Sequence, residues 1–364
     1  MNRTMDIVQA TRDYERWLGR HTRLIPAQLR WKHGLMRQSA FRFLRATFYR
    51  WAQVWPEICP KLITAPNVLA VGDLHVENFG TWRDAEGRLV WGINDFDEAA
   101  PQPYTIDLVR LLASALLAGK ENLLAVNQAA MAGAVLEGYR DGLKESGRPF
   151  LLGDKNKRLL EMAQGDKRSP TLFWHKMDEF QRLKKIPKSA GRAIQALLPV
   201  PRLKLTFAHR VCGLGSLGLK RFVVLSNWHG GRLAREAKAT ALSATVWAGH
   251  ADPALGSQYQ RILDHAVRSP DPFVRVQGSW LVRRLSPDCS RIQLGDLPVK
   301  RDELRLLYSM GWETANIHLG TQKARRPVLS DLNKRRSGWL LDASRAMVQA
   351  VMSDWKQWRR ASGS

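Results

Sequence analysis

The chain has 364 residues, 45% of them hydrophobic and 25% charged, a globular composition with enough apolar residues for two cores or one large one. Its cysteines, Cys59, Cys212 and Cys289, are far apart and lack metal-ligand spacing, which excludes a disulfide scaffold and favours a reducing cytoplasm. The 57 Lys and Arg residues against 33 Asp and Glu give a formal charge of +24, which favours anionic partners such as nucleic acid or phosphorylated small molecules.

No membrane association is expected. The opening residues MNRTMDIVQATRDYERW contain acids and no apolar core, so they do not predict a signal peptide. The most apolar run, LLASALLA at 111–118, is much shorter than the roughly 20 residues that span a bilayer. We therefore expect a cytoplasmic protein.

Apolar spacing predicts alternating helical and β-rich blocks. The helix within 39–55 is expected to stop at Pro56. Residues 182–204 hold prolines among basic residues and are the best candidate boundary between two lobes. The predicted blocks are helical at 1–58, 106–143, 302–317 and 337–360, and β-rich at 68–99, 207–240 and 273–293.

The first chemical motif is the loop VGDLHVEN, which follows an apolar strand at 67–71. The strand ends at Gly72, and Asp73, His75 and Asn78 crowd the turn that follows. Phosphoryl transfer needs a carboxylate that deprotonates the acceptor hydroxyl, and Asp73 is the candidate for that base. His75 is the rival base, or it supports the loop. The side chain of Asn78 offers an oxygen ligand of the kind that Mg²⁺ prefers.

A hairpin brings a second group of carboxylates after this loop. FGTWR, a turn at 84–87 and RLVWGI predict two strands, and the second delivers the sequence Asn-Asp-Phe-Asp. Asp95 and Asp97 are the candidate metal ligands, and Asp97 is alternatively a supporting or solvated carboxylate. Asp107 opens the next helix. Taken singly, such residues are more often turn formers or helix caps. Their joint spacing is what favours a phosphoryl-transfer site with Mg²⁺ and ATP.

The second motif, GLGSLGLKRFVVLSNWHGGRLAREAK, begins with Gly213, Gly215 and Gly218 around Ser216. A dinucleotide-binding loop would open a helix, whereas these glycines lead into a strand, a turn and another strand. That order is typical of the loop that covers the phosphates in a kinase nucleotide lobe. Lys238 is then the phosphate-binding lysine. Arg235 is the alternative, because the sequence does not fix the register of a short strand. The alternative is a plain hairpin with bulge glycines.

Together the motifs resemble those of protein-kinase-like phosphotransferases, especially the aminoglycoside phosphotransferase and choline kinase branch. More closely, the chain resembles an uncharacterised bacterial family called domain of unknown function 2252, through FRFLRATFYRW, GDLHVENFG, INDFDEAAP, IDLVRL, GLGSLG, REAKA and GWETANIHLG. The resemblance implies that Asp73 is the catalytic-loop aspartate, Asn78 and Asp95 hold the metal, and Asp107 braces the catalytic loop. It implies little about the substrate, because the substrate of that family is not established.

The order of the motifs departs from that of a kinase, because the glycine loop and Lys238 follow the catalytic loop. We therefore predict an α+β, two-lobed, kinase-like fold that is circularly permuted. No Glu stands at 257–267 to pair with Lys238, which leaves Asp264 and Glu236 as candidates. The expected parts are an N-terminal helical segment at 1–66, a catalytic and metal-binding lobe at 67–200, a β-rich nucleotide lobe at 205–300, and helices at 301–364 that return to the catalytic lobe.

Three functions remain open from the sequence. The first is an ATP- and Mg²⁺-dependent phosphotransferase that acts on an unidentified hydroxyl-bearing acceptor. The positive charge of the chain would also suit an anionic acceptor. The second is a nucleotide-binding pseudoenzyme, which is disfavoured because Asp73, Asn78 and Asp95 are all present. The third is a nucleic-acid-binding protein that uses its basic surface, although no known binding module is recognised.

Overall fold

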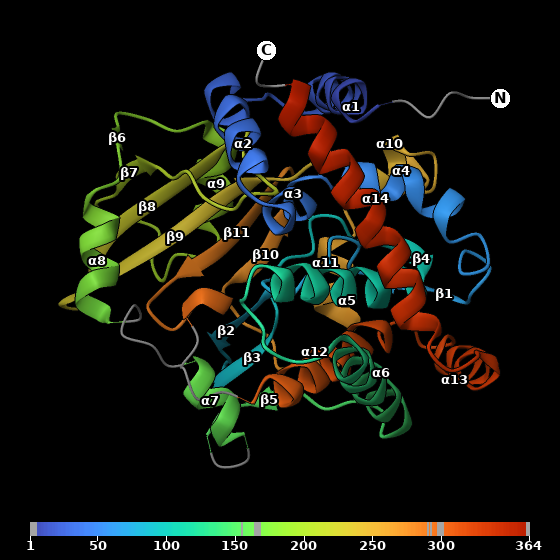
Figure 1. The fold of residues 1–364 in the computed structure, drawn as a ribbon. Coiled ribbons are helices and arrows are strands. Elements are labelled where there is room, and N and C mark those ends of the chain that lie inside the picture. The colour runs from blue at the N-terminus through green and yellow to red at the C-terminus, as the bar shows by residue number, and fades with distance from the viewer. Residues whose placement is uncertain are drawn as a thin grey trace.

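Helices and antiparallel sheets are combined in this fold (Figure 1). The computed structural model describes residues 6–153, 156–163, 169–289, 291, 293–296 and 302–361. Its sheets in this part of the chain have six, three and two strands, and its helices cover them or pack on one another. The α+β class predicted from the sequence is confirmed.

The N-terminal block is helical, as predicted, but it is broken in one unexpected place. Its helices are α1 (Ile7–His21), α2 (Pro26–Gln38), α3 (Ala40–Ala46) and α4 (Phe48–Ile58). Thr47 separates α3 from α4 because its backbone leaves the helical region, with φ −127° and ψ 42°. The expected stop at Pro56 is wrong, since α4 runs on to Ile58. Proline lacks only its own amide, so the helix loses the single bond to the carbonyl oxygen of Ala52 and continues to Ile58.

Two small sheets carry the first motif. Strand β1 (Asn67–Ala70) pairs with β4 (Ala100–Pro103). The predicted hairpin forms from β2 (Phe79–Arg83) and β3 (Leu89–Ile93), and β3 also pairs with β5 (Phe150–Leu151). The hairpin turn closes through the amide of Gly87, which donates to the carbonyl oxygen of Asp84 at 3.1 Å. The loop 71–78 follows β1 and the segment 94–99 follows β3 of the other sheet, and the amide of Asn94 donates to the carbonyl oxygen of Asn78 at 3.2 Å.

A bundle of helices packs beneath these sheets. Helix α5 (Thr105–Lys120) is buried at every residue from 105 to 118, which matches its apolar composition on all faces. Helix α6 (Gln128–Lys144) packs closely on α12 (Glu303–His318), and α14 (Trp339–Ala361) packs on α5. The shorter helices of this part are α7 (Lys157–Ala163) and α13 (Arg325–Lys334). Among the helices of the described ranges, none combines the length and apolar composition that crossing a membrane requires.

The second motif lies in the six-stranded antiparallel sheet, whose strand order is β10-β11-β9-β8-β7-β6. Its strands are β6 (Arg182–Leu183), β7 (Thr206–His209), β8 (Arg221–Trp228), β9 (Gly231–Ala239), β10 (Val274–Gln277) and β11 (Trp280–Leu285). Helix α9 (Lys188–Gln195) packs on β9 and β11, so the segment 182–204 forms part of this sheet unit. The remaining helices near the sheet are α8 (Pro170–Asp178), α10 (Ala244–Trp247) and α11 (Tyr259–His265).

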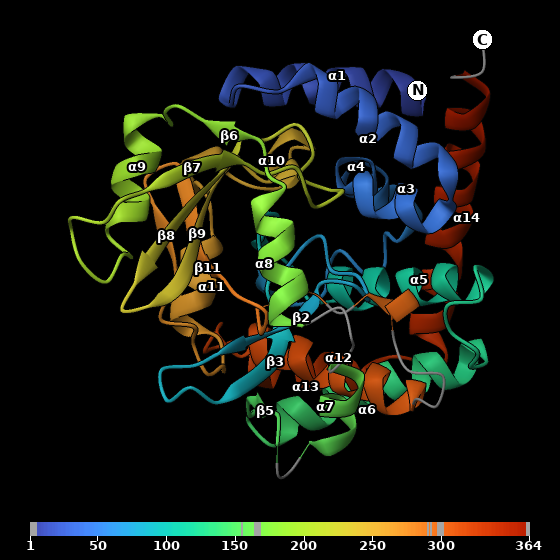
Figure 2. The same cartoon turned by 90° about the vertical axis from the view of Figure 1, so that its left-hand side faces the viewer.

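Figures 1 and 2 show the six-stranded sheet on one side of the molecule and the bundle of α5 and α14 on the other. Helices α1 to α3 lie between them along one edge. The first helix, α1, contacts the last helix, α14. Segments from both ends of the chain therefore meet on the helical side.

Candidate active site

The loop after β1 carries Asp73 into a narrow cavity of about 70 Å³. Gly72 makes the turn possible, because its φ of +81° favours glycine and a Cβ there would come within 2.4 Å of the carbonyl oxygen of Glu98. Asp107, at the start of α5, accepts the amides of Val71 at 2.7 Å and Gly72 at 2.9 Å. Asp107 therefore holds the loop in place, in the position where the sequence predicted a brace.

Asp107 is itself held by the end of α12. Nε2 of His318 donates to Asp107 at 2.9 Å, and the hydroxyl of Tyr139 lies 2.8 Å from Nδ1 of the same ring. All three side chains are buried. A chain of hydrogen bonds thus connects α6 and α12 to the loop that carries Asp73.

An arginine orients the carboxylate of Asp73. Nε of Arg110 donates to Oδ1 of Asp73 at 2.9 Å, and its Nη2 bonds the same oxygen. The guanidinium lies 5.0 Å from the ring centroid of Phe48 and 4.9 Å from that of Trp51, so it is fixed by aromatic contacts. Burial raises the pKa of Asp73, against the lowering effect of Arg110. A Cβ on Gly215 would lie 3.5 Å from Oδ2, so this second oxygen faces the glycine loop.

His75 lies beside Asp73 in the cavity, but its ring is already engaged. Its Nδ1 accepts the backbone amide of Glu77 at 3.2 Å, so the neutral ring carries its proton on Nε2. Burial lowers its pKa well below the usual value, and the charges of Arg45 and Arg291 lower it further. The ring can therefore donate a hydrogen bond into the cavity but has no free nitrogen to accept a proton.

Asp95 and Asp97 follow β3 and meet Lys238 from β9. The ammonium of Lys238 forms an ion pair with Asp97 and lies 3.6 Å from Oδ1 of Asp95. Asp95 is also paired with Arg291. Burial lowers the pKa of Lys238 although Asp95 raises it. For Asp95, the nearby charges of Lys238 and Arg291 outweigh the opposing effect of burial and hold its pKa below the usual value.

The glycine loop, residues 213–218, lies beside these acidic side chains. Gly213 and Gly218 have φ of +79° and +102°, which favour glycine, whereas at Gly215 a Cβ would be tightly placed, 3.2 Å from the carbonyl oxygen of Arg45. The hydroxyl of Ser216 donates to the carbonyl of Gly213 at 3.3 Å and closes the loop on itself. Gly213, Gly215 and Ser216 line the same cavity as Asp73, His75, Asn78, Asp95 and Asp97.

Helix α2 holds the glycine loop from the other side. Lys32 donates to the carbonyl oxygen of Gly215 at 3.2 Å, and Gln28 accepts the amide of Gly218 at 3.1 Å. The amide of Ile25 donates to the carbonyl oxygen of Gly218 at 2.9 Å. The N-terminal helices are thus connected directly to the loop that the second motif forms.

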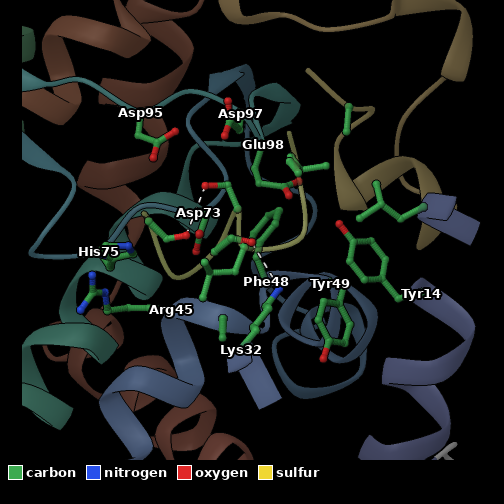
Figure 3. Close-up of a pocket in the computed structure, with 18 of the residues that line it drawn as sticks. Tyr14, Lys32, Arg45, Phe48, Tyr49, Asp73, His75, Asp95, Asp97 and Glu98 are labelled. Carbon is green, nitrogen blue, oxygen red and sulfur yellow. Dashed lines mark hydrogen bonds between the residues drawn. The ribbon is translucent and has the colours of Figure 1, made fainter. Parts of the chain in front are cut away.

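Acidic and aromatic side chains share the cavity. Figure 3 shows Asp95, Asp97 and Glu98 along one side, with Tyr14 and Tyr49 farther from Asp95. Burial raises the pKa of Glu98 to about 7, although its carboxylate accepts the amide of Ala244 at 2.6 Å. One wall of the cavity is therefore suited to hydrogen-bond donors and the other to apolar surface.

The sequence offered Arg235 as an alternative to Lys238, and Asp264 and Glu236 as its acidic partners. None of these three takes part in the ion pair of Lys238. Arg235 donates to the carbonyl oxygen of Leu197 at 3.0 Å, on the side of the sheet away from Asp95. Asp264 is exposed and accepts from Gln260. Glu236 is bound by arginines. Asp97 and Asp95 are therefore the acids that Lys238 meets, and neither was among the partners predicted for it.

Several residues of the site were missed by the sequence reasoning. Arg110 stands one helical turn after Asp107 in IDLVRL, so its place on the same face of α5 could have been read from the spacing. Lys32 and Arg291 had no such signal, because each reaches the site from a segment far away in the sequence.

Asn78, Asp95 and Asp97, which the sequence predicted to hold Mg²⁺, line one small cavity, in which Asp97 is paired with Lys238. Oδ1 of Asn78 is buried and has no hydrogen-bond partner among the described residues, while its amide nitrogen donates to the carbonyl of Asp73 at 2.6 Å. Asp95 supplies a carboxylate in the same cavity. Within the described residues no group of three or more His, Cys, Asp or Glu side chains is gathered as a metal site. Mg²⁺ commonly uses one or two protein ligands together with water and phosphate oxygens.

A protein family matches part of the chain. Residues 23–182 match the model of a family described as "Uncharacterized protein conserved in bacteria (DUF2252)". The match covers under half of the chain, includes the loop of Asp73 and the Asp95 segment, and ends before the glycine loop. It supports the resemblance to this bacterial family that the motifs indicated. No curated protein and no solved structure matches the chain.

Proposed function

We propose that the protein is an ATP- and Mg²⁺-dependent phosphotransferase that transfers a phosphoryl group to a hydroxyl-bearing acceptor. The observation that carries the proposal is the contact between the two motifs. Lys238 pairs with Asp97 and Asp95 although about 140 residues separate them, and the glycine loop adjoins Asp73. A glycine loop and a strand lysine placed over paired carboxylates are the parts that phosphoryl transfer requires.

We also propose that the fold is kinase-like and circularly permuted. The catalytic loop comes first in the chain and the glycine-loop sheet second. Helix α12, which resembles the helix before a kinase catalytic loop, comes after both, yet His318 at its end binds Asp107. A contact between α1 and α14 supports this arrangement, because permutation requires that segments near the natural ends can lie close together.

Asp73 is assigned as the base that takes the proton from the acceptor hydroxyl. Arg110 holds Oδ1 and leaves Oδ2 toward the glycine loop. His75 is less suited, because Nδ1 already accepts the amide of Glu77. A base that is fixed by a neighbour and has one free oxygen can meet the hydroxyl without reorganising.

The other residues are assigned to the phosphates of the nucleotide. Oδ1 of Asn78 and the carboxylate of Asp95 would hold Mg²⁺, which neutralises charge on the phosphate oxygens when it is bound. Lys238 donates to phosphate oxygens from β9. Gly213 and Gly215 present backbone amides without side-chain bulk, whereas the amide of Gly218 is bound by Gln28.

The decisive experiment measures phosphate transfer from ATP to a panel of hydroxyl-bearing metabolites, with Asp73→Asn as the blank. General-base help contributes about 10²–10⁴-fold, so Asp73→Asn should lose turnover by that factor while keeping ATP affinity within about threefold. His75→Ala is the matched variant, and it should retain most of the turnover. Loss of turnover in His75→Ala but not in Asp73→Asn would reverse the assignment of the base.

Binding of the nucleotide is tested separately by thermal unfolding. ATP should raise the melting temperature in the presence of Mg²⁺, and Asp95→Asn should abolish the part of that rise that depends on Mg²⁺. A rise without any turnover on the panel, unaffected by Asp73→Asn, would favour a nucleotide-binding pseudoenzyme. No rise with ATP at any Mg²⁺ concentration would refute the proposal.

A basic segment supports nucleic-acid binding as a second candidate function. Residues 180–235 contain no Asp or Glu, and Lys184, Lys185, Lys188 and Arg192 are exposed on or beside α9. Retention on DNA or RNA should then fall steeply with salt, with a log–log slope of about −0.9 for each phosphate contact to duplex DNA. Binding that does not respond to salt would remove this candidate. A cytoplasmic location stays a prediction from the cysteine content.

A further inference from the structure

A second and larger cavity lies on the other side of the glycine loop. Its volume is about 750 Å³, within the usual range for small-molecule sites. Gly213, Arg45 and Arg291 line both cavities, so the two adjoin. The proposed phosphotransferase chemistry assigns no role to the remaining walls, which strands β8 and β11 of the six-stranded sheet and the β2–β3 hairpin help to form.

Arginines dominate these walls. Arg210, Arg221 and Arg283 converge on the single buried carboxylate of Glu236, at 2.6, 3.0 and 2.8 Å. Burial alone would raise the pKa of Glu236, but the charges of Arg283, Arg210 and Arg221 outweigh it and hold the pKa well below the usual value. Three cations thus share one anion, which leaves an excess of two positive charges beside the cavity.

Arg268 adds a further positive charge. Among the described residues it makes no ion pair, and its guanidinium lies 4.6 Å from the ring centroid of Trp82 and 5.3 Å from that of Phe96. Burial lowers its pKa, which means that the surroundings disfavour its charged form. A buried, unpaired cation is costly unless an anion joins it.

Unused hydrogen-bond donors point to the same conclusion. The Nε atoms of Arg221, Arg268 and Arg284 are buried and find no acceptor among the described residues, and the side chain of Arg221 is only 3% exposed. Buried polar groups in folded proteins are nearly always satisfied. The protein itself therefore leaves three of the arginines around this cavity incompletely hydrogen-bonded.

We propose that this cavity is a binding site for a small, phosphate-rich anion. Phosphate suits the walls because the fork of a guanidinium matches its oxygens and its charge balances the excess. The cavity also has the aromatic rings of Tyr259 and Phe173 in its lining, which suit the organic part of a phosphorylated molecule. The anion comes either from the phosphate chain of the nucleotide or from a separate phosphorylated compound.

The test is calorimetric titration of the full chain with inorganic tripolyphosphate in EDTA, which removes the Mg²⁺ that the proposed catalytic site needs. The wild-type protein should bind saturably. Arg268→Met should weaken binding about tenfold or more, because one charged hydrogen-bonding partner is lost. The melting temperature of the variant without ligand is measured as well, so that a loss of binding is distinguished from a loss of folding.

Two further variants make the result specific. Arg232→Met is the matched control, because Arg232 is on β9 of the same sheet but pairs with the exposed Asp178, and binding should be unchanged. Arg283→Met should weaken binding as Arg268→Met does. Absence of saturable binding by the wild-type protein, or affinity equal to that of the wild type in both Arg268→Met and Arg283→Met, would overturn the proposal.

Competition then identifies the source of the anion. Suppose that ATP displaces tripolyphosphate in EDTA, and that Arg268→Met also weakens the binding of ATP. The cavity then takes the phosphate chain of the nucleotide. If ATP binds without displacing tripolyphosphate, the site belongs to a separate phosphorylated compound. Asp73→Asn should leave tripolyphosphate binding intact in either case, because among the described residues Asp73 is paired with Arg110 and with none of the arginines of this cavity, so this site and the proposed catalytic function can fail independently.

Discussion

Replacing Asp107 by Asn tests how strongly the buried brace holds the loop of Asp73. Oδ2 of Asp107 accepts the amide of Val71 at 2.7 Å and Nε2 of His318 at 2.9 Å, and Oδ1 accepts the amide of Gly72 at 2.9 Å. Asn has one acceptor oxygen instead of two. Whichever way its amide is turned, an NH₂ group faces a buried N–H, and at least one donor loses its partner.

The cost follows from this arrangement. If the oxygen of Asn takes the place of Oδ2, the amide of Gly72 is left buried and unsatisfied, which costs about 1–3 kcal/mol. The bonds from Val71 and His318 remain but lose the strength that the negative charge provides, which adds about 1–2 kcal/mol. We therefore expect Asp107→Asn to lower the free energy of unfolding by about 2–5 kcal/mol. The protein should still fold, since domains are typically stable by about 5–15 kcal/mol.

Urea unfolding followed by circular dichroism measures this change. Asp288→Asn is the control, because its ion pair with Arg83 at 2.8 Å is 42–44% exposed and should contribute less than about 1 kcal/mol. A loss of under about 1 kcal/mol in Asp107→Asn, equal to that of the control, would refute the view that Asp107 braces the loop through these bonds.

Two further predictions concern the core. Burial raises the pKa of Glu313 to about 7, so the folded state binds its proton more strongly than the unfolded state, and the contribution of Glu313 to stability should fall by roughly 3 kcal/mol as pH rises from about 4.5 to 7. Glu313→Gln should remove this contribution from the pH profile of urea unfolding and leave that of Glu98, whose pKa is also raised to about 7; an unchanged slope would contradict the assignment. In α6, a Cβ on Gly138 would lie 1.9 Å from the carbonyl oxygen of Tyr308, whereas Gly133 has open space. Gly138→Ala should therefore lower the melting temperature, and Gly133→Ala should raise it through a gain of up to about 1 kcal/mol; two equal shifts would count against this packing.

Local patterns in the sequence account for much of the fold. The β2–β3 hairpin and its turn at 84–87 were predicted from alternation and turn residues, because both depend on neighbours in the chain. Helices α12 and α14 lie within one or two residues of their predicted ranges for the same reason. The separation of α3 from α4 at Thr47 was not predicted, since the apolar spacing continues across it.

Residues of the candidate site were recognisable individually, whereas their partners were not. Gly215 and Lys238 both belong to the second sequence motif. In the structure Gly215 lies beside Asp73, and Lys238 lies beside Asp95. Helical and strand periodicity describes which face of an element is buried, and carries no information about which distant element covers it.

The sequence by itself therefore determined the order of the main helical and β-rich blocks, the α+β class and the residue types that the candidate chemistry needs. Only the tertiary structure decided that Lys238 meets Asp97, that Arg110 orients Asp73 and that Lys32 binds the glycine loop. The physical reason is the distance along the chain over which each kind of interaction acts. Backbone propensity and turn chemistry act over a few residues, while a buried ion pair depends on the packing of whole elements that lie far apart in the chain.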